Sequence, residues 1–152
     1  MATSEASTTS SALMVRPPPG RWMDCSVVKP IEMPRTASVK MGVDPKTIVL
    51  NHTSGIVRYV VVARGPSAVN ATYEGIRCAT GEFRIYARQV QGGEWTPNSD
   101  TAWKPMQQQS NVMVKHPLQL ARDGMSMGVT LRQTEKETIR ELLTGNQALY
   151  NY

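Results

Sequence analysis

The stretch from Ile56 to Trp103 constrains the fold more than any other part of this chain. It combines short runs of β-branched and aromatic residues with glycine-containing turns, among them Ala79-Thr80-Gly81 and Gln91-Gly92-Gly93. Short strands joined by tight turns build an antiparallel sheet in which strands adjacent in sequence pair with each other. The sequence therefore predicts a mainly β protein: a small antiparallel β-meander sheet or sandwich, with a C-terminal helix and an extended N-terminal arm.

Individual strands are expected at residues 47–50, 56–63, 70–78 and 82–90, with a return strand from residue 94. The run from Ile56 to Ala63 is almost continuously apolar, which is typical of a central strand covered on both faces. Residues 82–90 alternate instead. Strict alternation would place Phe83, Ile85 and Ala87 on one face, and Arg84, Tyr86 and Arg88 on the other.

The changes in composition along the chain predict four segments. Residues 1–43 form an extended N-terminal arm, 44–105 the β-meander core, and 106–132 an irregular arm. Residues 133–152 form a helix and tail that pack on the core or on a partner. In this last segment Thr134 and Glu137 make a capping box, and Gly145 ends the helix, whose apolar face would carry Ile139, Leu142 and Leu143.

The basic charge balance permits several kinds of partner without choosing among them. The sequence has 17 Lys and Arg residues and 12 Asp and Glu residues, which gives a net charge of +5. Nucleic acid, an anionic membrane surface and an acidic protein are all compatible with this charge. No run approaches the roughly 18 apolar residues that a membrane-spanning helix needs, so membrane contact is expected to be peripheral only. The N-terminus as it stands shows no secretory signal pattern.

The two cysteines, Cys25 and Cys78, can form one disulfide, two buried thiols or a contact with another chain. His52 and His116 do not lie at ligand spacing from them, so no metal site is expected. No arrangement of nucleophile and base is visible near Cys78, and no phosphate-binding glycine loop leads into a helix. The sequence therefore predicts a protein that is not an enzyme, with no catalytic residues and no cofactor.

Polar side chains on the central strands form the candidate binding face. They are Tyr73, Glu74, Arg77, Arg84 and Tyr86. The simpler interpretation is that Glu74 forms an ion pair with Arg77 or Arg84 across neighbouring strands. A basic and aromatic face for single-stranded nucleic acid is an alternative, but alternation divides the arginines and tyrosines between both faces.

Several motifs in the central stretch occur in the order of one known family. Tyr73-Glu74-Gly75-Ile76-Arg77-Cys78 is followed by Arg84, Tyr86 and Ala87, then by Trp95 and Trp103-Lys104-Pro105. This pattern, over about residues 56–105, resembles the cryptic neisserial protein family. Residues 147–152 are similar to the C-terminal pattern of the family.

The resemblance implies a small exported bacterial protein without an established activity. The family's C-terminal pattern continues to a cysteine that would pair with Cys78, whereas this sequence stops at Tyr152. Cys78 is then either reduced and buried or paired with Cys25. The long N-terminal extension is expected to lie outside the family pattern.

The favoured functional prediction is a non-catalytic accessory subunit of a large multi-protein assembly, specifically a mitochondrial respiratory-chain complex on the inner membrane or its intermembrane side. The arms would contact other subunits, with Arg16 and Trp22 as contact residues. A free-standing exported binding protein of the bacterial periplasm is one alternative. An RNA-associated subunit, such as a mitochondrial ribosomal protein, is the other.

Overall fold

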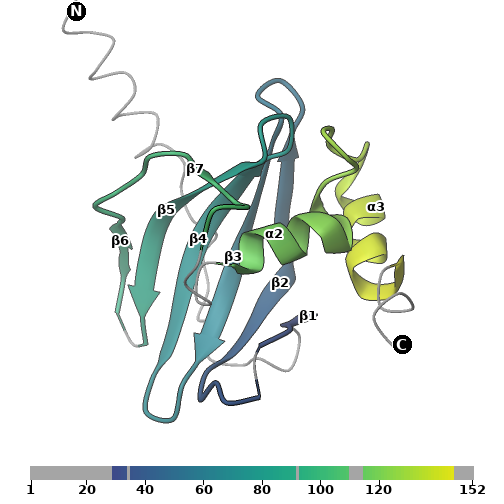
Figure 1. The fold of residues 1–152 in the computed structure, drawn as a ribbon. Helices are drawn as coiled ribbons and strands as arrows, with labels where there is room; N and C mark the ends of the chain where they lie inside the picture. The colour runs from purple at the N-terminus through teal and green to yellow at the C-terminus, as the bar shows by residue number, and fades with distance from the viewer. Residues whose placement is uncertain (1–28, 34, 92, 110–114, 146–152) are drawn as a thin grey trace, which may run out of the picture.

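The computed structural model describes residues 29–33, 35–91, 93–109 and 115–145 (Figure 1). In this part of the chain, one twisted sheet is covered on one face by a helical layer. The sheet consists of β1 (Lys29–Ile31), β2 (Lys40–Asn51), β3 (Ile56–Arg64), β4 (Val69–Arg77), β5 (Glu82–Val90), β6 (Trp95–Pro97) and β7 (Lys104–Pro105). The helical layer consists of α2 (His116–Leu120), η3 (Ala121–Met125), α3 (Glu135–Arg140) and η4 (Glu141–Gly145).

The strands follow one another as an antiparallel meander in the order β1 to β6, and β7 pairs with the start of β5. Gly55 and Gly81 adopt positive φ in the two hairpins that join β2 to β3 and β4 to β5. Glycine enters this backbone region without a steric cost, which lets the chain reverse tightly. The predicted mainly antiparallel β fold is confirmed.

The sheet begins earlier in the chain than the predicted boundary at residue 44. Strand β1 and the first four residues of β2, 40–43, lie within the segment assigned to the N-terminal arm, and there β1 pairs with β2. Asp44-Pro45 lies in a bulge of β2, where the β2–β3 register shifts between Asp44 and Val49. Thr47 Oγ1 donates to Asp44 O at 2.7 Å and accepts from Val60 N at 2.8 Å, so the bulge stays hydrogen-bonded inside the sheet.

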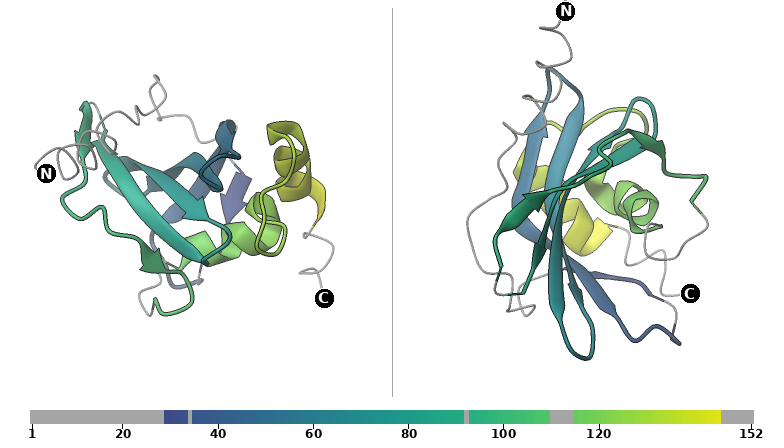
Figure 2. Two further views of the ribbon diagram at one scale, coloured as in Figure 1. Left: turned by 90° about the horizontal axis from the view of Figure 1, so that it is seen from above. Right: turned by 90° about the vertical axis from the view of Figure 1, so that its left-hand side faces the viewer.

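The helices cover one face of the sheet, as Figure 2 shows from two further directions. Helices α2 and η3 cross this face, and α3 packs beside β2. Residues 115–125, expected in an irregular arm, therefore belong to the folded domain. The main core between the two layers is built from Val43, Ile48, Val57, Tyr59, Val61, Ile76 and Phe83 of the sheet with Leu120, Ala121, Met125 and Leu142 of the helices.

Helix α3 begins as predicted, since Thr134 Oγ1 accepts a hydrogen bond from Glu137 N at 3.1 Å. The Glu135 carboxylate accepts from Leu50 N on β2 at 3.0 Å, and this hydrogen bond lowers the pKa of Glu135. The predicted apolar face is wrong at Leu143, which is 44% exposed, whereas the preceding Leu142 is buried. No helix in the described ranges has the length and apolar character needed to cross a membrane.

The strict alternation predicted for β5 is also wrong, because the β4–β5 register shifts between Tyr73 and Glu74. Tyr73 pairs with Ala87 and Glu74 pairs with Ile85, which leaves Tyr86 as the extra residue of a bulge. Tyr86 and Ala87 consequently share the sheet face away from the helices. They form a second cluster there with Val60, Val62, Ala71 and Tyr73.

Candidate functional site

Glu74 lies on the helix-covered face of the sheet and pairs with His116 at the start of α2. His116 Nε2 lies 2.7 and 2.9 Å from the two carboxylate oxygens, and Thr72 Oγ1 donates to Glu74 Oε2 at 2.6 Å. Both partners are buried. The predicted ion pair of Glu74 with Arg77 or Arg84 is therefore wrong, since both arginines point to the opposite face. Arg77 instead pairs with Glu82 at 3.3 Å.

The tyrosine on the neighbouring strand completes this buried group. Tyr59 on β3 is directly opposite Glu74 on β4, and it is fully buried. Burial raises the pKa of the Tyr59 phenol well above its ordinary value, and the nearby Glu74 carboxylate adds to the effect. This group is closed off from solvent, so we assign it a structural role in holding α2 on the sheet.

The other face of the sheet carries a stack of alternating arginine and aromatic side chains. Cζ of Arg77 lies 4.2 Å from the centre of the Trp103 ring. Cζ of Arg84, on β5, lies 4.9 Å from the same ring centre. Arg84 and Arg58 each lie 5.5 Å from the centre of the Tyr86 ring. Guanidinium groups in such positions are attracted to the ring faces and remain charged. We call Arg58, Tyr86, Arg84, Trp103 and Arg77 the arginine–aromatic stack.

Gly75 makes room for this stack. A Cβ atom on Gly75 would lie 2.9 Å from both Cε2 and the hydroxyl oxygen of Tyr86, and 3.2 Å from Ile56 Cγ2. Real Cβ atoms essentially never come that close to another side chain. The glycine of the Tyr73–Cys78 motif thus lets the Tyr86 ring lie against β4, where Tyr73 also contacts it at a ring distance of 5.5 Å.

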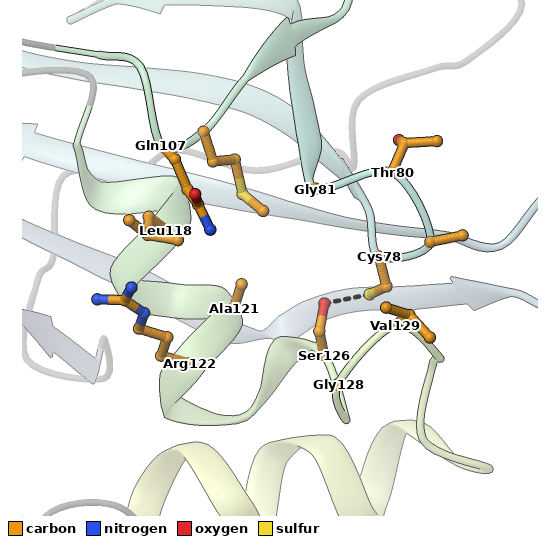
Figure 3. Close-up of a pocket in the computed structure, with 12 residues that line it drawn as sticks. Cys78, Thr80, Gly81, Gln107, Leu118, Ala121, Arg122, Ser126, Gly128 and Val129 are labelled. Atoms are coloured by element: carbon orange, nitrogen blue, oxygen red, sulfur yellow. Dashed lines mark hydrogen bonds between the residues drawn. The ribbon is translucent and has the colours of Figure 1, made fainter.

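Cys78 follows β4 and lines a cavity of about 440 Å³ between the β4–β5 turn and η3 (Figure 3). Its thiol is free and contacts Ser126 Oγ, and Sγ lies 3.9 Å from Met125 O. Burial raises the pKa of Cys78, an effect that the Ser126 contact partly offsets. A raised pKa keeps the thiol protonated at neutral pH, which is the opposite of what a nucleophilic cysteine requires.

We predict that Cys78 is alkylated slowly by iodoacetamide at pH 7.5 in the folded protein and rapidly in urea. The reagent attacks the thiolate. The raised pKa of Cys78 limits the fraction of thiolate, and its 5% exposure limits the access of the reagent. Mass spectrometry of a Cys25→Ser variant, in which Cys78 is the only thiol, provides the measurement. Equal alkylation rates in buffer and in urea would contradict the buried, protonated state.

A second cavity, of about 290 Å³, lies at the outer edge of β5. Strand β6 pairs with Ala87–Gln89 and β7 pairs with Glu82–Phe83, so the two ends of this edge are covered. The connecting residues 98–103 pass over the middle of the edge, where Asn98 N donates to Tyr86 O at 2.9 Å. We call the space between this connection and β5 the β5-edge cleft.

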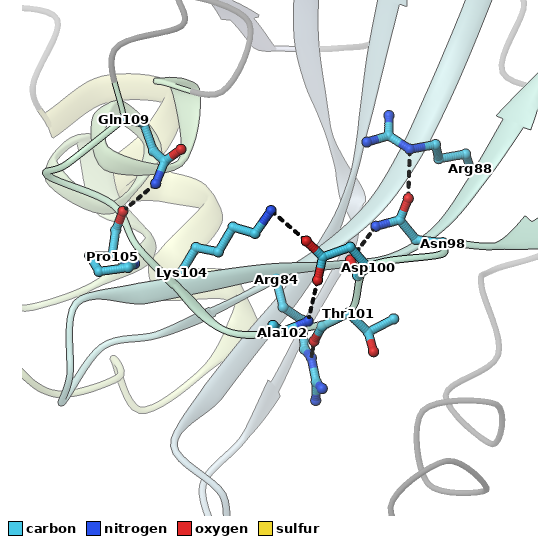
Figure 4. A network of polar contacts seen from close by, with 9 residues as sticks. All are labelled: Arg84, Arg88, Asn98, Asp100, Thr101, Ala102, Lys104, Pro105 and Gln109. Carbon is cyan, nitrogen blue, oxygen red and sulfur yellow. Dashed lines mark hydrogen bonds and ion pairs between the residues drawn. The ribbon is translucent and has the colours of Figure 1, made fainter.

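The β5-edge cleft is lined by more positive than negative charge. Arg84, Arg88 and Lys104 line it with a single carboxylate, that of Asp100. Figure 4 shows how the polar groups are held: Arg84 Nε donates to Thr101 O at 2.6 Å, and Arg88 Nε donates to Asn98 Oδ1 at 2.8 Å. Lys104 pairs with Asp100 at 2.8 Å, and hydrogen bonds from Lys104 and from Ala102 N lower the pKa of Asp100. The arginines are thus fixed in place with several donors left for a ligand.

The candidate residues predicted from the sequence are divided between two faces. Tyr73, Arg77, Arg84 and Tyr86 lie on one face of the sheet, whereas Glu74 lies on the other. Sequence reasoning missed Trp103, Lys104 and Asp100, although the sequence Trp103-Lys104-Pro105 was itself part of the family pattern. Cys25, Arg16 and Trp22 lie outside the described residues, so the predictions made for them stay predictions.

Comparison with known proteins places the chain in a family. A family model described as the CNP1-like family matches residues 6–143. The chain belongs to the CNP1-like family. The match starts well before residue 56, so the N-terminal segment predicted to lie outside the family pattern is largely inside it, while residues 147–152 follow the matched range. Searches among curated proteins and among solved structures found no match.

This CNP1-like chain therefore carries two features that could hold a ligand. The larger cavity beside Cys78 is mixed in character, with apolar and polar walls. The β5-edge cleft is smaller and cationic, and it shares Arg84 with the arginine–aromatic stack.

Proposed function

We propose that this CNP1-like protein is a non-catalytic binding protein that holds a small oxyanion in the β5-edge cleft. The observation that carries the proposal is the lining of the cleft, in which Arg84, Arg88 and Lys104 outnumber the one acid, Asp100. Guanidinium groups bind phosphate and carboxylate through paired, charge-assisted hydrogen bonds. Because the arginines are already positioned by Thr101 O and Asn98 Oδ1, little side-chain ordering is needed when the anion binds.

The size of the cleft favours a small ligand. Sites for drug-sized molecules occupy about 300–1,000 Å³, and the 290 Å³ of the β5-edge cleft is at the lower limit of that range. A phosphate or carboxylate group with a small body attached would fit this volume. The guanidinium of Arg84 packs over the rings of Trp103 and Tyr86, and these contacts restrict its orientation.

We predict that inorganic phosphate and citrate bind the wild-type protein and that Arg88→Gln weakens both by about tenfold, since one charged hydrogen bond contributes about 1.5–3 kcal/mol and solvent exposure reduces that value. Isothermal titration calorimetry at low ionic strength is the measurement. Arg84→Lys should have a comparable effect because lysine keeps the charge and loses the planar fork.

Lys40→Gln is the matched control, because it removes one positive charge from an exposed position on β2. Its affinity for both anions should stay within about twofold of wild type, as a distant surface charge acts only through a screened field. Absence of binding to wild type at low salt, or equal loss in the Lys40→Gln and Arg88→Gln variants, would refute the cleft as an anion site.

The accessory-subunit prediction stays a prediction. It relied on residues 1–43 and 106–132 acting as arms on neighbouring chains. The described part of the first range contributes β1 and the first four residues of β2, and that of the second contributes α2 and η3. These residues pack within the domain, which favours the binding-protein alternative.

A further inference from the structure

The cavity beside Cys78 differs in chemistry from the β5-edge cleft. Its volume of about 440 Å³ lies well within the range of small-molecule sites, roughly 300–1,000 Å³. Its base is apolar and aliphatic, built from Met106, Leu118 and Ala121. None of its described lining residues is aromatic and none is acidic.

The polar groups of this cavity gather at two ends. Arg122 and Gln107 lie at one end and Cys78 and Ser126 at the other, with Ala121 between them (Figure 3). Val129, which is 67% exposed, extends the apolar wall to the surface beside Ser126. Gly81 and Gly128 stand at turns with positive φ, and a Cβ on either would meet nothing within 4 Å. Both glycines therefore border open space at the rim of the cavity.

We propose that this cavity binds a medium-chain aliphatic carboxylate. The carboxylate would be held by Arg122 and Gln107, and the chain would lie over Ala121 towards Val129. A guanidinium has five donors, so Arg122 can bind a carboxylate alongside another contact. The lack of acidic lining residues among those described favours an anionic head group. The lack of aromatic ones favours an aliphatic chain over a ring that would need a stacking partner.

The proposal makes a specific prediction for a homologous series. Hexanoate, octanoate and decanoate should bind the full chain with rising affinity, by about fourfold for each methylene that enters the apolar cavity. Decanol should bind about tenfold more weakly than decanoate, because it lacks the charge that Arg122 recognises. Titration calorimetry, with each ligand kept below its micelle concentration, measures these ratios.

Two variants locate the site. Ala79→Trp places a large ring at the exposed rim of the cavity and should weaken decanoate binding at least tenfold, while Ser67→Trp, on the exposed β3–β4 turn, should leave it unchanged. Arg122→Gln should remove the preference for decanoate over decanol. Arg88→Gln, which acts on the β5-edge cleft, should not affect decanoate.

The outcomes separate this site from the first. Affinities that do not change along the series, or equal decanoate binding in Ala79→Trp and Ser67→Trp, would overturn the proposal. Loss of phosphate binding together with intact, chain-length-dependent decanoate binding would reject the anion cleft and leave this cavity as the ligand site.

Discussion

Replacing His116 by leucine should lower the free energy of unfolding by about 3–5 kcal/mol, because it leaves the buried Glu74 carboxyl group without its imidazole partner. Thr72 Oγ1 would remain as a hydrogen-bond donor to Glu74, but one hydroxyl does not replace the contacts of the imidazole with both carboxyl oxygens. Urea denaturation followed by circular dichroism measures the loss. The reciprocal variant, Glu74→Leu, should be destabilising by a similar amount.

The double variant distinguishes the pair from simple packing. Glu74→Leu with His116→Leu replaces both members by apolar side chains. Replacing a whole buried pair in this way is often neutral or stabilising, whereas removing one partner is strongly destabilising. We therefore expect the double variant to be more stable than either single variant. Strictly additive losses in this cycle would mean that Glu74 and His116 do not stabilise each other.

Replacing Gly75 by alanine should destabilise the protein by about 1–3 kcal/mol, because the added Cβ would lie 2.9 Å from the Tyr86 ring and hydroxyl. Tyr86 would have to move, and with it the support of Arg58 and Arg84. The variant should therefore also bind phosphate more weakly. A thermal melt and a phosphate titration test the two effects on the same preparation.

Gly65→Ala is the matched control for this substitution. Gly65 directly follows β3, whereas Gly75 lies within β4. A Cβ on Gly65 would meet ordinary contacts at 3.7 and 3.9 Å, and its φ is not positive. We expect no loss of stability, or a gain of about 0.4–1 kcal/mol from the less flexible unfolded chain. If Gly65→Ala and Gly75→Ala lose the same amount, the close approach of Tyr86 does not explain the effect.

The central strands and their order could be predicted because the sequence signals there are local. The apolar run of β3 and the turns at Gly55 and Gly81 act over a few residues, and antiparallel pairing of neighbours follows from the short connections. The start of α3 was predictable for the same reason, since Thr134 and Glu137 are three residues apart. Part of the candidate face was predictable as well, because Tyr73 and Arg77 are four residues apart on β4 and therefore lie on the same face of the sheet.

The parts that sequence reasoning missed depend on contacts between distant segments or on irregular backbone. Tyr86 is the extra residue of a bulge, and nothing in the alternation of β5 distinguishes a bulge from a regular strand. Glu74 and His116 are 42 residues apart, so their pairing is set by the docking of α2. One signal was available: Glu74 is the only acid within β4, and an isolated acid in a strand often marks a buried partner elsewhere.

The short strands at the margins of the sheet have a consequence for self-association. Exposed strand edges recruit other chains by offering unpaired amides and carbonyls. Here β1, β6 and β7 have three, three and two residues, and the Glu135 carboxylate occupies the Leu50 amide on the free part of β2. The margin formed by β6 and β7 therefore presents no long template for strand addition within the described sheet, and on the β2 margin the Glu135 carboxylate already accepts from the Leu50 amide.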